Sequence, residues 1–131
     1  MPGRPEPAPV KPPIAIVEDD AAVREALRTV LELDGYAVSA FQSAEALFAA
    51  GGLDAATCLI LDVNLPGMSG LQALDRLRLA GGAFAAIVVS ARATDEMRRE
   101  AARLKAADFL EKPIDVDALL DTLGRLAGER T

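Results

Sequence analysis

Short, fully apolar runs alternate along the chain with segments whose apolar residues recur every three or four positions. The runs predict five strands, at 14–17, 36–41, 57–61, 85–89 and 108–110. The periodic segments predict five helices, which end near Gly35, Gly51, Gly81, Lys105 and Ala127. Strands that are apolar throughout need cover on both faces, and helices between parallel strands form right-handed crossovers. The pattern therefore predicts a doubly wound α/β fold.

Polar residues at the predicted helix starts agree with this division of the chain. Asp20, Ser43, Thr94 and Asp115 each precede an apolar-periodic segment, where their side chains can accept hydrogen bonds from the first free backbone N–H groups. Residues 2–13 hold six of the eight prolines and have no apolar periodicity. We therefore expect a disordered proline-rich tail over 1–13, one domain over 14–127 and a flexible C-terminus over 128–131.

Composition excludes several classes of function. The 131 residues suffice for one domain with a sizeable core, and the 14 basic and 20 acidic residues give a net charge of −6. That charge argues against direct nucleic-acid binding by this domain. No apolar run approaches the ~18 residues of a membrane span, and the N-terminus lacks the apolar centre of a signal peptide. The expectation is a cytoplasmic protein without membrane contact.

Chemically active side chains appear where the predicted strands end. Glu18 and Asp19 follow the first strand, Asp62 follows the third, Ser90 closes the fourth and Lys112 follows the fifth. The carboxyl ends of parallel strands share one edge of the sheet, and ligands of open α/β sheets bind beyond that edge. We therefore expect these five side chains to converge.

The chemistry of this set points to a cation and a phosphoryl group. Two carboxylates 4 Å apart repel by about 4 kcal/mol at an effective dielectric constant of 20, so a cluster of three favours a bound divalent ion. The chain contains no histidine, and oxygen ligands alone suit Mg²⁺, for which Mn²⁺ can substitute. Asp62 can then attack phosphorus as a nucleophile while Lys112 neutralises charge and the Ser90 hydroxyl donates to a phosphoryl oxygen.

These residues resemble the motifs of the receiver domain of two-component response regulators, over residues 14 to about 127. The matching motifs are Glu18-Asp19, Asp62 with Leu65-Pro66 and Gly70, Ser90-Ala91, and Lys112-Pro113. The resemblance implies a flavodoxin-like (βα)5 parallel sheet with strand order 2-1-3-4-5. It also implies a cis peptide bond before Pro113.

By the same resemblance, Asp62 is a phosphoacceptor whose donor is the phosphohistidine of a sensor histidine kinase or of a histidine phosphotransfer protein. Asp19, Asp62 and the backbone carbonyl of Asn64 would bind Mg²⁺, with Glu18 assisting through water. The protein would assist its own phosphorylation and dephosphorylation without being a turnover enzyme. Glu18 itself departs from the family pattern, in which aspartate is commoner at that position.

The resemblance further implies that Ser90 and Phe109 form a switch, in which Ser90 turns towards the phosphoryl group and Phe109 moves inward. The surface of the last two helices and the strand between them would then change for a downstream protein partner or a phosphorylation-dependent homodimer. The fourth helix carries a basic group, which is either a solvated face or a docking surface: Arg98, Arg99, Arg103 and Lys105. Lys105 stands where many members have glycine, and Ile114 where phenylalanine is frequent.

Three alternatives accompany this interpretation. Because no effector module follows residue 127, the first expectation is a stand-alone receiver or a phosphorelay member. The alternative is the receiver part of a longer DNA-binding transcription regulator. A phosphatase of the haloacid dehalogenase type fits poorly, since Glu18-Asp19-Asp20 lacks that family's Asp spacing after the first strand. A pseudo-receiver is disfavoured because the acidic, hydroxyl and lysine set is present.

Overall fold

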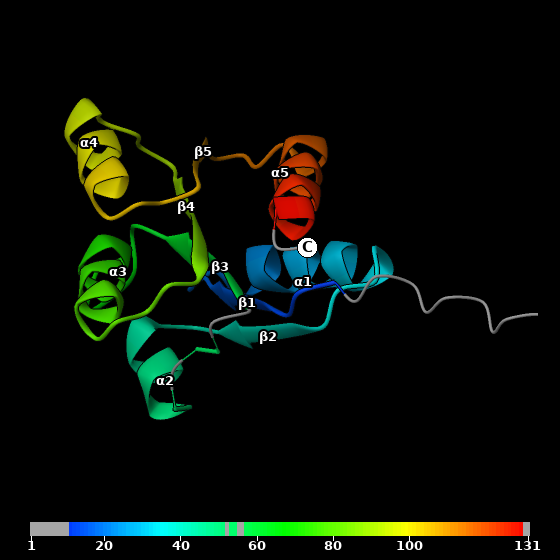
Figure 1. Ribbon diagram of the computed structural model, residues 1–131, viewed down its shortest axis with the longest axis horizontal. Coiled ribbons are helices and arrows are strands. Elements are labelled where there is room, and N and C mark those ends of the chain that lie inside the picture. Colours follow the sequence, from blue (N-terminus) through cyan, green and yellow to red (C-terminus); the bar gives the residue numbers. More distant parts are fainter. Residues whose placement is uncertain (1–10, 52, 55–56, 130–131) are drawn as a thin grey trace, which may run out of the picture.

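Five parallel strands form the sheet in a computed structural model that describes residues 11–51, 53–54 and 57–129. The strands are β1 (Ile14–Val17), β2 (Val38–Phe41), β3 (Cys58–Asp62), β4 (Ala85–Ser90) and β5 (Asp108–Glu111). They lie in the order β2-β1-β3-β4-β5 (Figure 1). This confirms the predicted fold class and strand order, in which the chain reverses its direction of winding between β1 and β3.

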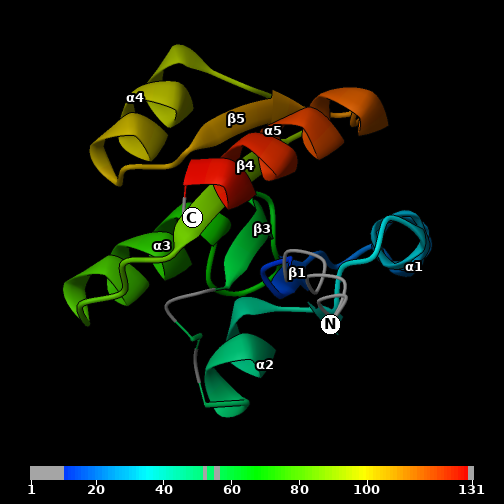
Figure 2. The ribbon, with the colours of Figure 1, turned by 45° about the vertical axis from the view of Figure 1, so that its right-hand side comes forward.

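Helices cover both faces of the sheet, so the molecule has three layers. The helices are α1 (Ala21–Leu33), α2 (Ala44–Ala49), α3 (Gly70–Leu79), α4 (Asp95–Arg103) and α5 (Val116–Glu129). One face is covered by α1 and α5 and the other by α2, α3 and α4 (Figures 1 and 2). Among the helices of the described residues, none is long and apolar enough to cross a membrane.

Two hydrophobic cores, one on each face, explain why the strands read as continuous apolar runs. Ile14 and Ile16 of β1 pack with Leu27 and Leu31 of α1, whereas the alternate residues of the strand, Ala15 and Val17, belong to the opposite core. Side chains alternate between the two faces along a strand, and here both faces are buried. Cys58 is buried in the α1 and α5 core, as its apolar neighbours predicted.

Capping residues start the helices at the positions that the sequence indicates. The side chains of Asp20, Ser43 and Thr94 each accept a hydrogen bond from a backbone N–H in the first turn of α1, α2 and α4. Helix α4 ends two residues before Lys105, which adopts a φ of 60°. The N–H of Lys105 donates to Ala102 and that of the next residue to Ala101, so the lysine occupies the left-handed position where glycine is usual.

Element ends differ from the sequence prediction by one or two residues. Strand β2 starts at Val38 rather than at Tyr36, whose buried ring instead packs against the α1 and α5 core. Strand β3 includes Asp62, and β5 continues to Glu111. Helix α5 reaches Glu129, two residues beyond the predicted domain end, while residues 130–131 lie outside the described part of the chain.

Contacts of the chain begin before Ile14, the predicted start of the folded domain. The Lys11 ammonium donates to the Asp34 carbonyl and lies 3.2 Å from the Asp34 carboxylate and 4.6 Å from the centre of the Tyr36 ring. The Pro13 carbonyl accepts a hydrogen bond of 2.9 Å from the N–H of Cys58. Residues 1–10 of the predicted tail lie outside the described residues.

Gly70 allows the start of α3 to approach the end of β3. A Cβ atom at this position would lie 2.0 Å from the Asp62 carbonyl oxygen and 2.9 Å from the Val63 Cα. The Gly70 N–H donates to the Val63 carbonyl at 2.9 Å, so the two segments are in direct backbone contact. The glycine of the Asp62 motif therefore sets the position of the backbone that carries Asp62.

Gly70→Ala is expected to lower the free energy of unfolding by about 2 kcal/mol or more, because backbone atoms must move to admit the new methyl group. Urea unfolding measures the change. Gly124→Ala in α5 is the matched control, since nothing lies within 4 Å of its Cβ position and alanine favours the helix. Equal stabilities of Gly70→Ala and the wild type would contradict this role.

Candidate functional site

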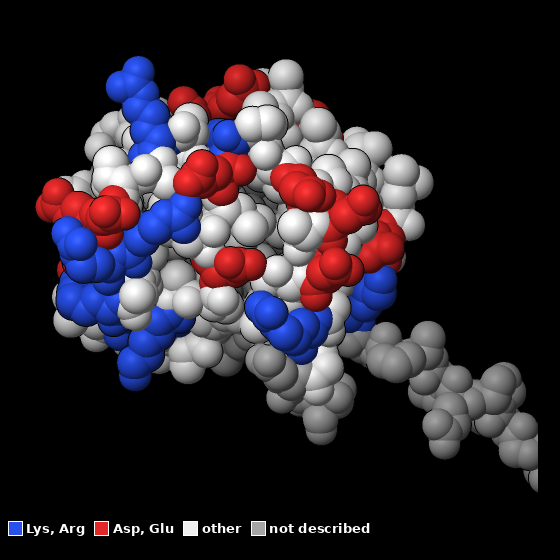
Figure 3. Space-filling model, turned by 90° about the horizontal axis from the view of Figure 1, so that it is seen from above, with Lys and Arg blue, Asp and Glu red and all other residues white. Residues whose placement is uncertain are grey.

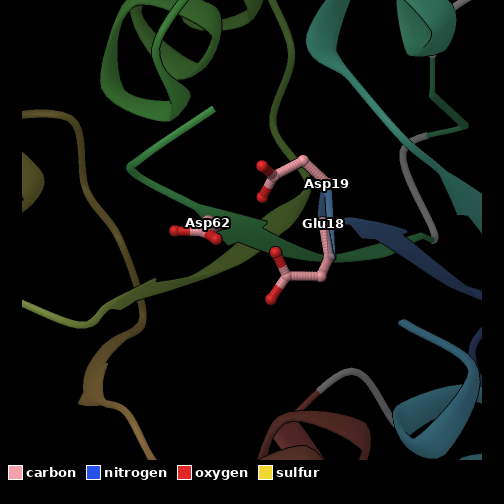
Figure 4. Close-up of side chains that lie close together, drawn as sticks. All are labelled: Glu18, Asp19 and Asp62. Atoms are coloured by element: carbon pink, nitrogen blue, oxygen red, sulfur yellow. The ribbon is translucent and has the colours of Figure 1, made fainter. Parts of the chain in front are cut away.

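Three carboxylates meet where β1 and β3 end. These strands are neighbours in register, with Val17 beside Leu61, so Glu18 and Asp62 occupy corresponding places at the carboxyl edge. Glu18 and Asp62 are buried and Asp19 is exposed, and one carboxylate oxygen from each lies within 4.8 Å of the others. Figure 4 shows Glu18 and Asp19 at the end of β1 approaching Asp62 on β3.

The Lys112 ammonium joins the two buried carboxylates. It donates to Glu18 Oε1 at 2.5 Å and to Asp62 Oδ2 at 2.8 Å, and its side chain is 22% exposed. Its backbone N–H donates to the Ser90 carbonyl at 2.9 Å, and the peptide bond to Pro113 is cis, as predicted. Three strand ends, those of β1, β3 and β5, thus contribute to one charged cluster.

Burial and crowding change the proton affinity of this cluster. The pKa of Glu18 is raised to about 7, chiefly by burial and also by the neighbouring Asp62, against the opposing effect of Lys112. Burial lowers the pKa of Lys112, but its hydrogen bonds and charge interactions with Asp62 and Glu18 outweigh that effect and leave it raised. The Lys112 ammonium therefore remains charged. It is a single positive charge in a cluster with three carboxyl groups, those of Glu18, Asp19 and Asp62.

The donor set fits a small divalent cation. The grouped ligand atoms of Glu18, Asp19 and Asp62 are all carboxylate oxygens, and the sequence contains no histidine. Oxygen-only sites favour hard cations such as Mg²⁺ over Zn²⁺ or Cu²⁺. The cluster can therefore hold a metal ion, as predicted from the sequence, whereas coordination by the Asn64 carbonyl stays a prediction.

Asn64 links Asp62 to Ser90. The Asn64 backbone N–H donates to Asp62 Oδ1 at 3.0 Å, and its side-chain amide lies 3.5 Å from Ser90 Oγ. Ser90 is fully buried at the end of β4, where its hydroxyl also accepts from the Arg92 N–H at 3.1 Å and lies 3.9 Å from the Met97 sulfur. The structure thus brings Ser90 to the same edge, with its hydroxyl engaged by the loop after β4.

Phe109 lies further from the carboxylates, on the edge strand β5. Its half-buried ring packs against the core on the α2, α3 and α4 face. The Arg98 guanidinium of α4 covers the ring, with Cζ 4.8 Å from the ring centre. Phe109 therefore lies beside β4, the strand that ends at Ser90.

Two supporting residues were missed by the sequence reasoning. Arg24 of α1 donates to the backbone carbonyls of Glu18 and Asp19 at 2.8 and 3.4 Å, which fixes the turn that carries both acids. The Glu45 carboxylate of α2 accepts from the Met68 N–H at 2.9 Å, and that bond lowers the pKa of Glu45. No sequence signal separates these two side chains from other charged residues on exposed helices.

The fold and this edge are those of a receiver domain. A family model of the response regulator receiver domain matches residues 14–124, so the chain belongs to the response regulator receiver family. This confirms the resemblance drawn from the strand-end motifs. It also places the chain outside the haloacid dehalogenase alternative.

Individual relatives agree with the family. The transcriptional regulatory protein FixJ of Azorhizobium caulinodans is 41% identical over 119 residues, which cover 88% of this chain and 56% of that protein. The response regulator protein FleR of Pseudomonas aeruginosa is 40% identical over 114 residues, 87% of this chain and 24% of that one. The solved response regulator StyR has a TM-score of 0.80 at 32% identity and covers 92% of this chain. The chain spans about half or less of the length of these two curated relatives.

Glu18 is expected to make the metal-free protein less stable as pH rises. Its folded-state pKa of about 7 exceeds its ordinary value of 4.5, so between these values the folded state binds more protons than the unfolded state. The free energy of unfolding should then fall by up to about 3 kcal/mol from pH 4.5 to pH 7 through this group. Urea unfolding in EDTA at several pH values measures the slope.

Glu18→Gln should remove this part of the pH dependence and leave a protein that is more stable than the wild type above pH 7, because the buried negative charge is gone. Identical slopes in the variant and the wild type would show that Glu18 is not protonated in the folded state.

Proposed function

We propose that this receiver is a phosphorylation-dependent signalling switch in which Asp62 accepts a phosphoryl group from a sensor histidine kinase or a histidine phosphotransfer protein. The observation that supports this most strongly is the buried Asp62 carboxylate, 2.8 Å from the Lys112 ammonium and grouped with two further acids at the ligand edge of the sheet. A carboxylate in this setting has an ammonium beside it to neutralise the phosphoryl oxygens.

The transfer replaces a P–N bond of the donor by a P–O bond to Asp62. An Asp62 carboxylate oxygen attacks phosphorus, the P–N bond breaks, and its electron pair returns to the donor imidazole. Lys112 balances the charge on the transferred oxygens from its place beside Asp62 Oδ2. When bound by Glu18, Asp19 and Asp62, Mg²⁺ or Mn²⁺ supplies the remaining charge neutralisation.

The product stays attached to the protein, so the receiver is a phosphoacceptor that assists its own modification and is not a turnover enzyme. Hydrolysis of the acyl phosphate ends the signal. Asn64 is an exposed residue whose backbone N–H already donates to Asp62 Oδ1. The carbonyl of the same residue is the proposed fourth ligand of the cation.

The signal leaves the site through Ser90 and Phe109. The Ser90 hydroxyl, now engaged by the Arg92 N–H, turns to a phosphoryl oxygen, and Phe109 moves into the space behind it. Val88 and Ser90 of β4 pair in register with Phe109 and Glu111 of β5, so a change at one strand end is passed to the other directly. The altered surface of α4, β5 and α5 then binds a downstream protein.

The output is proposed to be protein contact by this receiver or its part in a phosphorelay. A second candidate is the receiver part of a DNA-binding transcription regulator, which is favoured by the 41% identity to FixJ, a transcriptional regulatory protein nearly twice as long as the matched segment. In both cases the receiver itself, with a net charge of −6, is not expected to bind nucleic acid.

Incubation with acetyl phosphate and Mg²⁺ is expected to add the mass of one phosphoryl group, because a small acyl phosphate can replace the protein donor. EDTA should prevent the addition, and Asp62→Ala should abolish it. Intact-mass spectrometry measures all three results.

Asp20→Ser is the matched control for this experiment. It removes a neighbouring exposed carboxylate but keeps a side-chain oxygen that can cap α1. The control should be phosphorylated as the wild type is. Undiminished labelling of Asp62→Ala would overturn the assignment of the acceptor.

A further inference from the structure

Helix α4 contacts both proposed switch residues through two consecutive side chains. The Met97 sulfur lies 3.9 Å from Ser90 Oγ, at the distance of a weak O–H···S hydrogen bond. The next residue, Arg98, places its guanidinium Cζ 4.8 Å from the centre of the Phe109 ring. The beginning of α4 therefore covers the two side chains whose positions are proposed to report phosphorylation.

Arg98 makes two contacts on one face of β5. Phe109 and Glu111 are two residues apart on the strand, so their side chains project to the same side of it. Arg98 lies over the ring of the first and forms a hydrogen-bonded ion pair with the carboxylate of the second. Because the arginine is 44% exposed and the glutamate 60%, the ion pair alone contributes little to stability. Its effect is to orient the guanidinium over the ring.

We propose that Arg98 is a positioning residue that holds Phe109 in its resting position and so sets how readily the receiver switches; this rests on the proposed function. The cation–π contact exists only while the ring lies under Arg98, and inward movement of Phe109 would break it. An interaction made in only one of two states shifts the equilibrium towards that state. Arg98 therefore opposes activation, and phosphorylation must overcome it.

The opposite end of α4 is held separately. The Arg78 guanidinium of α3 donates to the carbonyls of Leu104 and Lys105 at 2.9 and 3.3 Å, just beyond the last turn of α4. It also donates to the Gly82 carbonyl at 3.0 Å, which ties the α3–β4 turn to the same point. Release of Arg98 would thus free the beginning of α4 while its end stays attached to α3.

Helix α4 carries a second arginine, Arg99, that can serve as a control for the charge of Arg98. Lys and Arg side chains gather on the left of Figure 3, the side on which α4 lies in Figure 1, while Asp and Glu are more frequent to the right. Arg99 belongs to the same helix and carries the same charge, but Arg98 is the residue placed over the Phe109 ring. Replacing either arginine by glutamine therefore removes one positive charge from this surface, but only the substitution of Arg98 removes the contact with the Phe109 ring.

The test uses the whole chain labelled with fluorophenylalanine and titrated with beryllofluoride and Mg²⁺, a phosphoryl analogue that needs no kinase. The four phenylalanines give four fluorine resonances, and Phe109→Leu identifies the one from Phe109. In Arg98→Gln, the Phe109 resonance is expected to lie closer to its beryllofluoride-bound position before any addition. The apparent Kd for beryllofluoride should fall roughly two- to five-fold.

Arg99→Gln should leave both the resonance and the apparent Kd as in the wild type. If Arg98→Gln matches the wild type in both measurements, or if Arg99→Gln reproduces its effect, the positioning role is wrong. A wild type that shows no response to beryllofluoride would instead overturn the proposed function. Should Arg98→Gln fail to fold, Arg98→Lys provides the same test, because lysine keeps the charge but lacks the planar group that lies over the ring.

Discussion

The Lys112 ammonium between Glu18 and Asp62 is the interaction on which the rest of the site depends. It brings together the ends of β1, β3 and β5, at 2.5 and 2.8 Å from the two carboxylates. Without it, two buried negative charges would face each other at a cost of about 4 kcal/mol at 4 Å and an effective dielectric constant of 20. One ammonium does not balance three acids, and the negative charge that remains is what a divalent cation can neutralise.

The buried cluster of Glu18, Asp62 and Lys112 lowers the stability of the fold in return for a concentration of charge at the site. Burial raises the pKa of Glu18 to about 7, so the ionised cluster strains the folded protein near neutral pH. Gly70 packs directly against the Asp62 backbone, because a Cβ atom at position 70 would clash with the Asp62 carbonyl. A buried, charged edge thus lies beside α4, whose beginning contacts Ser90 and Phe109 through exposed or half-buried side chains. The buried carboxylates and ammonium suit the proposed phosphoryl transfer, and the α4 contacts are few enough to change.

The sheet and most of the candidate site could be predicted from the sequence, because each strand is a short apolar run and the polar residues of the site lie at the ends of these runs. Asp62 and Lys112 were placed correctly at one edge since parallel strands all end there. The contact of Arg98 with Phe109 could not be predicted, because it depends on the direction of a long side chain between elements far apart in the chain. Arg24 and Glu45 were missed for a similar reason: their partners are backbone atoms, which leave no pattern in the sequence.

The claim that these carboxylates form one cation-binding unit is tested most directly by isothermal titration calorimetry with Mg²⁺. The wild type is expected to bind one ion, and both Asp19→Asn and Asp62→Asn should weaken binding by roughly tenfold or more, because each removes a charged oxygen ligand. Asp20→Ser, outside the cluster, should bind as the wild type does. Unchanged Mg²⁺ affinity in Asp62→Asn would contradict the account.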